Sequence, residues 1–324
     1  MRISDPMPIG GTDYPTTWVQ FLDWFHSEHA CRDYLEKLRW ADGLICPKCG
    51  VSSEVERMSR RRLICRACRH QATATAGTIF DKTRTELRVW FAAIWYITNQ
   101  KHGVSALGLQ RVLGLGSYET AWTMLHRLRR AMVRPDRDLL HGVVEVDESH
   151  LAIKDRQEPI VLTGRMHHTT KVMVAIAVEM LDPKGFGRIR IRQIARGDHE
   201  HLMPFISESV RPGAVIHSDG SAAYNKLRDA GYGHRRSVHL GSDKPAHESM
   251  PGVHRVASLL QRWMLGTHHG AVQPPQLDYY LDEFVFRFNR RTSRSRGLLF
   301  YRLLQQAVAT KPVTYGKIVG TSAA

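Results

Sequence analysis

The chain has 324 residues and carries 46 lysines and arginines against 31 aspartates and glutamates, which gives a formal net charge of +15. With 43% hydrophobic and 24% charged residues, the composition is that of a globular protein of two or three domains and excludes disordered or collagen-like chains. No apolar run is long enough to cross a membrane and the N-terminus lacks a secretory signal pattern, so we expect a cytoplasmic protein. The positive charge favours a polyanionic partner, most commonly nucleic acid.

Four of the five cysteines form two C-x-x-C pairs. Cys46 and Cys49 are followed, after fifteen intervening residues, by Cys65 and Cys68. This spacing is typical of a four-thiolate Zn²⁺ site, in which each pair forms a tight knuckle and a hairpin brings the knuckles together. Four protein ligands leave no position for water, so we expect the zinc to be structural. The fifth cysteine, Cys31, has no partner and is expected to be a small buried side chain.

Arginines with few acids among them lie between and around the knuckles. Arg60, Arg61 and Arg62 are the densest group, and guanidinium groups on a small ribbon are suited to contact phosphates. The alternative is a solvated arginine surface on a metal-held fold.

A helical module is predicted next. One amphipathic helix begins at Leu87, and Ser105 and Ser117 are the expected N-caps of two more, separated by glycines. Two helices joined by a short glycine turn are typical of a helix-turn-helix, although plain helical packing has the same pattern. The polar side of the third helix would carry the candidate DNA-binding residues Arg127, Arg129 and Arg130.

The C-terminal half is predicted to alternate strands with a helix. Strands are expected over 143–147, 171–178 and 188–194, a helix over about 199–210, and a fourth strand over 214–219. The alternation in 188–194 predicts one solvent-exposed face. This order is that of a ribonuclease-H-like α/β domain, whose first and fourth strands lie side by side. Asp147 and Asp219, at the expected ends of those strands, would therefore meet.

Two convergent carboxylates in a basic protein are best explained by divalent cations. Like charges at about 4 Å repel, and two Mg²⁺ ions remove the repulsion while using the oxygens as hard ligands. The chemistry that follows is in-line attack on a phosphodiester. Either acid alone would equally well cap a turn at a strand end.

Several stretches together resemble the IS1595 (ISXO2-like) family of insertion-sequence transposases. They are residues 39–50, Val-Glu-Val-Asp-Glu148, His-Ser-Asp-Gly220, 254–270 and 280–291, and the resemblance runs from about residue 18 to 304. It implies an N-terminal zinc ribbon, a DNA-binding helical region and a ribonuclease-H-like core. In that core, two Asp and a third ligand hold Mg²⁺ or Mn²⁺ for cleavage of transposon ends and their joining to target DNA.

Carried over residue by residue, the resemblance assigns Asp147 and Asp219 to the first two positions of the triad and His254 to the third. Related transposases have Glu there, while this family allows Asn or His. Imidazole brings no charge, so the site should bind Mg²⁺ less tightly. Glu248 is the competing carboxylate. The family Lys seven residues after the third ligand is here Gln261, which supplies no positive charge.

Further arginines gather near the C-terminal end, interleaved with phenylalanines. The functional interpretation is a phosphate-binding surface beside the active site, and the alternative is a core-packing Phe stripe with a solvated back. The candidate DNA-binding residues here are Arg262, Arg287, Arg290 and Arg291.

We therefore predict an α/β protein in which a zinc ribbon and a helix-turn-helix-like module precede a ribonuclease-H-like mixed-sheet domain. The expected segments are an N-terminal helical segment (1–40), the ribbon (41–76), the helical module (85–135), the catalytic domain (140–305) and a tail (306–324).

The leading hypothesis is a DNA transposase that acts at the nucleoid as a homo-oligomer on terminal inverted repeats and target DNA. One alternative is a catalytically impaired or repurposed copy that only binds DNA. Another is a nuclease without strand transfer, which would have no inverted repeats beside its gene.

Overall fold

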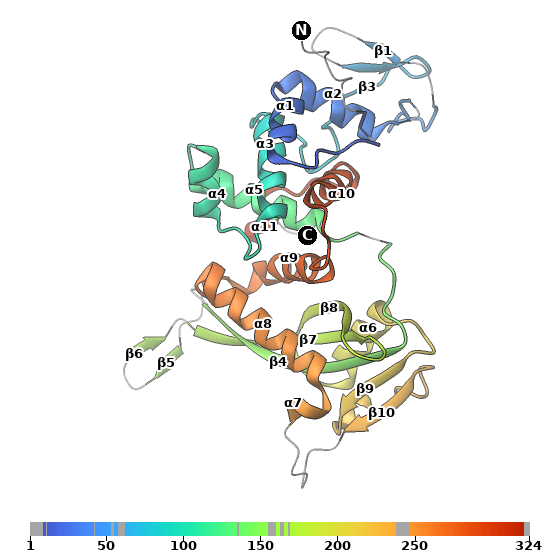
Figure 1. Ribbon diagram of the computed structural model, residues 1–324, viewed down its shortest axis with the longest axis vertical. Helices are drawn as coiled ribbons and strands as arrows, with labels where there is room; N and C mark the ends of the chain where they lie inside the picture. The colour runs from blue at the N-terminus through green and yellow to red at the C-terminus, as the bar shows by residue number, and fades with distance from the viewer. Residues whose placement is uncertain are drawn as a thin grey trace. The chain divides into compact units, whose positions relative to one another are not determined.

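The computed structural model describes residues 9–10, 12–41, 43–52, 55–57, 62–134, 136–154, 160–162, 165–167, 169–237 and 246–320. The chain divides into two compact units (Figure 1). Unit 1 joins Met1–Arg134 with Ser293–Ala324, and unit 2 is Pro135–Thr292.

Unit 1 is a helical body with a small antiparallel sheet. Its helices are α1 (Trp18–Trp24), α2 (Glu28–Arg39), α3 (Leu87–Asn99), α4 (Ala106–Leu113), α5 (Tyr118–Ala131), α10 (Arg296–Ala309) and α11 (Tyr315–Val319). Its strands, in the sheet order β1-β2-β3, are β1 (Val55–Arg57), β2 (Leu63–Cys65) and β3 (Gln71–Ala72).

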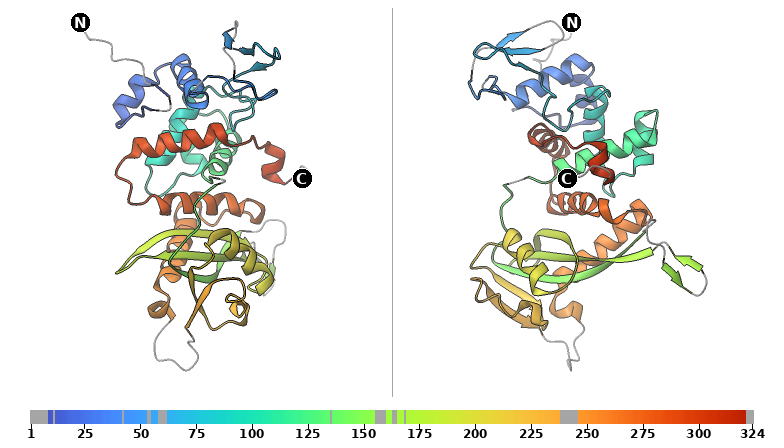
Figure 2. Two further views of the ribbon diagram at one scale, coloured as in Figure 1. Left: turned by 90° about the vertical axis from the view of Figure 1, so that its right-hand side faces the viewer. Right: turned by 180° about the vertical axis from the view of Figure 1, so that it is seen from behind.

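Aromatic side chains from both ends of the chain form the core of unit 1. The ring centroids of Phe25 and Phe91 of α3 lie 4.9 Å apart, and those of Phe21 and Phe300 of α10 lie 5.5 Å apart. Both pairs are edge to face. Such edge-to-face pairs add to the stabilisation that burial of the rings provides. Helix α10 therefore completes a core that the N-terminal residues begin (Figure 2).

The three predicted helices of the module are confirmed with their caps. Ser105 accepts a hydrogen bond from the Gly108 amide (3.1 Å) at the start of α4, and Ser117 accepts one from the Thr120 amide (3.1 Å) at the start of α5. Gly114 ends α4 in the left-handed region at φ 62°, a conformation that costs glycine little.

The C-terminal boundary differs from the sequence-based division. Residues from Ser293 onward belong to unit 1, whereas the predicted catalytic domain ran to residue 305. The reason is α10, whose apolar face packs against α2, α3 and α5. The predicted tail, 306–324, contains the end of α10 and all of α11.

Unit 2 is built on a five-stranded sheet. The strands of this sheet are β4 (Val143–Lys154), β7 (Thr169–Met180), β8 (Phe186–Ile194), β9 (Val215–Asp219) and β10 (Gly233–Ser237), and β5 (Ile160–Leu162) and β6 (Arg165–His167) form a separate hairpin. The helices of unit 2 are α6 (His199–Ser209), α7 (Ala246–Ser249), α8 (Pro251–His268) and α9 (Leu277–Asn289), with short 3₁₀ turns η2 (Ala222–Tyr224) and η3 (Pro274–Gln276).

The sheet has the order β10-β9-β4-β7-β8. Strands β4, β7 and β8 form an antiparallel meander, whereas β9 and β10 run parallel to β4 after the crossover helix α6. This is the ribonuclease-H-like arrangement, so the predicted fold class and the predicted pairing of the first and fourth strands are confirmed. The hairpin β5–β6 and the edge strand β10 were not predicted.

Helices cover both faces of the sheet (Figure 1). On one face, side chains of β4, β7 and β8 pack with α8 and α9, for example Leu151, Val174 and Val256. On the other face, alternate residues of the same strands pack with α6, for example Val144, Ala175 and Phe205.

Two sequence-based details are wrong. Asp147 is the fifth of twelve residues of β4 rather than its last, because β4 stays paired with β7 as far as Lys154. Strand β8 has no solvent-exposed face along its length: Arg190 is only 3% exposed and donates to the Asp138 carbonyl oxygen, and Arg192 lies over the ring of Phe205 of α6.

The docking of α10 against the N-terminal segment is testable at Gly297. A Cβ atom there would lie 1.7 Å from the carbonyl oxygen of Pro15. Gly297→Ala should therefore lower the free energy of unfolding of unit 1 by about 1–3 kcal/mol through overpacking, as measured by urea denaturation. Gly116→Ala is the matched control, since nothing lies within 4 Å of its Cβ. Equal stability of the two variants would contradict this docking.

Candidate functional site

Asp147 and Asp219 lie side by side because of the strand register. β4 and β9 are parallel, with Glu145 opposite His217, and two further residues along each strand lead to Asp147 and Asp219. Alternate residues of a strand share a face, so both acids point to the face of the sheet that α8 covers. The predicted meeting of the two acids is thus a property of the register.

Burial and mutual repulsion act on this pair. Burial raises the pKa of Asp147 above its usual range, and the charge of Asp219 raises it further. A hydrogen bond from the Glu148 amide (2.9 Å to Oδ1) and the charge of His254 act in the opposite direction. Asp219 Oδ1 accepts a bond from the Ser221 amide (2.9 Å). Each carboxylate is therefore oriented by a backbone amide.

Helix α8 carries His254 within electrostatic range of Asp147. His254 is half-buried on the first turn of α8 and lies close enough for its charge to act on Asp147. Glu248, the competing carboxylate, is exposed and lies on the short helix α7. Gln261 is exposed farther along α8, where its Nε2 donates to the carbonyl oxygen of His150 (3.3 Å).

Glu148 points to the opposite face of the sheet. Its Oε1 accepts a hydrogen bond from the hydroxyl of Tyr224 (3.1 Å), a contact that no feature of the sequence indicated. Burial, followed by the charge of Asp147, raises the pKa of Glu148 to about 7. Adjacent residues of a strand face opposite sides, so Asp147 and Glu148 cannot act from the same side.

The donor set of this site suits a hard divalent cation. Two carboxylates and an imidazole are oxygen and nitrogen ligands, and the repulsion between Asp147 and Asp219 is the kind that a cation removes. Among the described residues, the four cysteines of unit 1, whose sulfurs lie within 4.8 Å of one another, are the only group of three or more His, Cys, Asp or Glu side chains gathered this closely. Asp147, Asp219 and His254 are therefore neighbours whose ligand atoms are less closely gathered.

The four cysteines of unit 1 form a compact cluster. Cys46 Sγ lies 3.6 Å from Cys68 Sγ, and Cys49 Sγ lies 3.7 Å from Cys65 Sγ. A tetrahedral ion with Zn–S bonds of about 2.3 Å separates its sulfurs by about 3.8 Å, so the cluster fits zinc. β1 and β2 form the hairpin that brings the knuckles together, as predicted.

The two knuckles have the same backbone geometry. The Gly50 amide donates to the Cys46 carbonyl and the Arg69 amide to the Cys65 carbonyl, each at 2.8 Å. Both residues are left-handed, with φ of 71° and 59°. Such turns aim the two sulfurs of each pair at one point.

Comparison with known families gives one match in each unit of the chain. Residues 139–289 match the ISXO2-like transposase domain, and residues 26–71 match the transposase zinc-ribbon domain. The chain belongs to the ISXO2-like transposase family.

Two further similarities were found for the transposase. A protein in transposable element ISH50 of Halobacterium salinarum is 25% identical over 276 residues, which cover 81% of this chain and 91% of that protein. The solved Mos1 transposase paired-end complex with left transposon end is 14% identical, with 68% of this chain and 75% of that chain covered and a TM-score of 0.27.

No helix among the described residues of the transposase is long and apolar enough to span a membrane.

Cys31 is fully buried, as predicted, and burial raises the pKa of its thiol to about 12.

Some of the predicted DNA-binding arginines are at the surface. Arg130 and Arg262 are exposed, and Arg62 is exposed with its Nη1 donating to Gln71 (2.8 Å). Arg60 and Arg61 lie outside the described residues.

Other predicted arginines serve the fold. Arg129 is 1% exposed, so its predicted place on the polar side of the third helix is wrong. Arg287 pairs with the fully buried Glu283 at 2.7 Å. Arg290 stacks on Phe286 at 4.1 Å, and Arg291 donates to the carbonyl oxygens of Gly187 and Phe186. An arginine's partners depend on tertiary neighbours, which its sequence context does not reveal.

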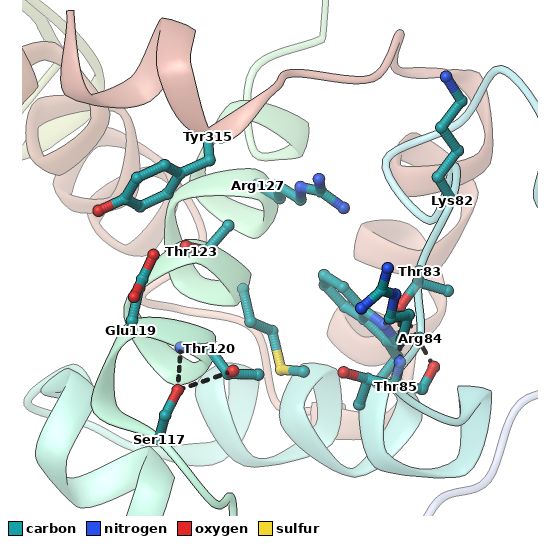
Figure 3. A pocket seen from close by; sticks show the side chains of 12 residues that line it. Lys82, Thr83, Arg84, Thr85, Ser117, Glu119, Thr120, Thr123, Arg127 and Tyr315 are labelled. Carbon is teal, nitrogen blue, oxygen red and sulfur yellow. Dashed lines mark hydrogen bonds between the residues drawn. The ribbon is translucent and has the colours of Figure 1, made fainter. Parts of the chain in front are cut away.

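A cavity of about 390 Å³ lies in unit 1 beside the start of α5. Figure 3 shows Lys82 and Arg84 on one side, Glu119 and Tyr315 on the other, and the guanidinium of Arg127 between them. Arg127 is half-buried, with its Nη1 3.4 Å from the Ile79 carbonyl oxygen. Sequence reasoning missed Lys82 and Arg84, although the basic, threonine-rich run 82–85 was a signal.

The cysteine cluster predicts the metal content of the purified transposase. Cys49→Ser should lower bound zinc from about one equivalent to almost none and unfold the ribbon, because structural zinc supplies its folding energy. Zinc is measured by atomic emission after dialysis, and local unfolding by proteolysis within residues 41–76.

Cys31→Ala is the control, since it removes a buried thiol outside the cluster. It should keep its zinc. Loss of zinc from this variant, or its retention in Cys49→Ser, would contradict the assignment.

Proposed function

We propose that this transposase binds the ends of an insertion sequence, cleaves them, and joins them to target DNA with divalent cations at Asp147, Asp219 and His254. The observation that supports this most is the in-register placement of the two acids beneath α8, which carries His254. An enzyme with this substrate works at the nucleoid, in the cytoplasm. Joining both ends in one event requires more than one copy, so we expect a homo-oligomer on DNA.

The residues have separate roles in the proposal. Asp147 and Asp219 would hold Mg²⁺ or Mn²⁺ through carboxylates that backbone amides orient. His254 would add a neutral ligand, which leaves the site one negative charge short of a three-carboxylate site. When bound, the two ions supply an activated attacking hydroxyl and a stabilised leaving oxygen.

The proposal predicts the loss of cleavage in Asp147→Asn. Without one carboxylate, the site loses several kcal/mol of charge stabilisation, so nicking should fall at least about 100-fold. The assay uses plasmid DNA that carries the element's own ends, with Mg²⁺ or Mn²⁺. Nicking by His254→Ala should also fall, whereas nicking by Glu248→Gln, which changes an exposed carboxylate on α7, should stay near the wild-type rate. Full activity of Asp147→Asn would mean that the active site lies elsewhere.

A second candidate function is DNA binding without catalysis. It is favoured by Gln261, which is exposed on α8 and brings no positive charge toward a phosphate. The comparison that separates the two functions is wild type against Gln261→Lys in a strand-transfer assay. An inactive wild type with an active Gln261→Lys would identify an impaired copy.

DNA binding would use the exposed cations of both units. In unit 1, Lys82, Arg84 and Arg127 gather three positive charges at one cavity next to hydroxyl groups of Ser117 and Thr120. Cations and hydroxyl groups are the usual partners of phosphate oxygens. We therefore propose that this cavity receives a backbone phosphate, a contact that positions DNA without reading its sequence.

Replacing Lys82 and Arg84 together by Ala should weaken binding to every DNA sequence. Two phosphate contacts fewer should lower the slope of log K against log salt by about 1.8. Affinity is measured by fluorescence anisotropy with end DNA and unrelated DNA at several salt concentrations. Lys101→Ala with Lys311→Ala removes the same charge from two other exposed positions of unit 1. An equal change in this control would show that only net charge matters.

A further inference from the structure

Glu145 is a buried carboxylate in the strand that carries Asp147. It is 2% exposed and precedes Asp147 by two residues, so both side chains leave β4 toward α8. A carboxylate so far from water needs hydrogen-bond partners, because its desolvation is costly.

The partners of Glu145 are the first amides of α8. Its Oε2 accepts hydrogen bonds from the Gly252 amide (2.7 Å) and the Val253 amide (3.0 Å). The first amides of a helix have no partner within the helix, and the N-cap residue of α8, Met250, supplies no side-chain bond. The strand thus provides the cap that the helix itself lacks, and a negative charge there is also favoured by the helix dipole.

Gly252 allows this close approach. A Cβ at residue 252 would lie 2.8 Å from Glu145 Oε2 and 2.9 Å from the sulfur of Met180. Both distances are shorter than real Cβ contacts, so a larger residue would have to displace the Glu145 carboxylate, the Met180 side chain or the start of α8. The contact between carboxylate and helix therefore has little freedom to shift.

We propose that Glu145 is a positioning residue that holds His254 over Asp147 and Asp219. His254 directly follows the second amide that Glu145 binds, and Asp147 follows Glu145 by two residues along the same face. One carboxylate thereby joins the backbone of the strand with the first acid to the backbone of the helix with the third ligand. This inference rests on the proposed function, because that proposal makes His254 the third metal ligand.

A purely structural role makes a different prediction. If Glu145 only stabilised the fold, or only added negative charge near the cations, its removal would have the same effect with or without the His254 imidazole. If it positions that imidazole, its effect should disappear once the imidazole is gone. A double-mutant cycle separates the two, since it isolates the coupling between the residues.

The cycle compares wild type, Glu145→Gln, His254→Ala and the double variant of the full-length, zinc-loaded protein. The readout is Mn²⁺ binding without DNA, from the paramagnetic resonance signal of free Mn²⁺. Residues that orient a metal ligand typically affect affinity 10–100-fold, so Glu145→Gln should weaken Mn²⁺ binding at least about 10-fold. In the His254→Ala background the same change should weaken it less than about 3-fold.

Glu179→Gln is the matched control. Glu179 is another buried carboxylate of the same sheet, 5% exposed and bonded by the amides of His141 and Arg188. Its replacement should lower stability and leave the Mn²⁺ affinity unchanged in both backgrounds. Urea denaturation of every variant verifies folding. If Glu145→Gln does not fold, Gly252→Ala disturbs the same contact from the helix side and enters the cycle in its place.

Equal weakening by Glu145→Gln in both backgrounds, or none in either, would overturn the positioning role. This failure is distinct from failure of the proposed function, which is tested by cleavage with Asp147→Asn. If Asp147→Asn is inactive and the cycle is additive, the active site stands and only the role of Glu145 falls. If Asp147→Asn cleaves normally, the active-site assignment itself falls.

Discussion

The parallel register between β4 and β9 is the constraint on which the rest of unit 2 depends. It places Asp147 and Asp219 next to each other although 72 positions separate them in the chain. A slip of one residue would turn one acid to the face that α6 covers and destroy the pair. Two apolar cores, one on each face of the sheet, hold the register, since the same slip would turn the core residues of the shifted strand, such as Ile216 of β9, to the opposite face.

Local features of the sequence were enough to predict much of the fold. The cysteine spacing predicted the cluster, Ser105 and Ser117 predicted the starts of α4 and α5, and the order of strands predicted the neighbours of β4. Each of these depends on residues close in the chain or on a topology with few alternatives. The length of β4 depends on its long-range pairing with β7, and the burial of Arg190 on its contact with the distant Asp138 carbonyl oxygen, so local patterns predicted neither.

The candidate site was likewise predicted only in part from the sequence. Asp147 and Asp219 were identified because acids that follow apolar runs are conspicuous, whereas Glu145 looked like one more polar residue of an apolar strand. Its partners are backbone amides 107 and 108 positions away. Because almost every residue has a backbone amide, the sequence does not indicate which amides bind a carboxylate. The arginines show the converse, because Arg287 looks like a DNA contact until its buried partner, Glu283, is seen. Part of the excess positive charge thus serves the interior.

Because unit 1 is built from two segments of the chain with unit 2 between them, it cannot finish folding early in synthesis. Phe300 and the rest of α10 leave the ribosome after the whole of unit 2, so the aromatic core that begins at Phe21 stays incomplete until all of unit 2 has been synthesised. A chain that stops near residue 292 would retain every residue of unit 2 and the ribbon cysteines but would lack the helix that closes the helical body. Interrupted copies of the gene would therefore yield products whose helical body remains unfinished, even where the sequence of unit 2 is intact.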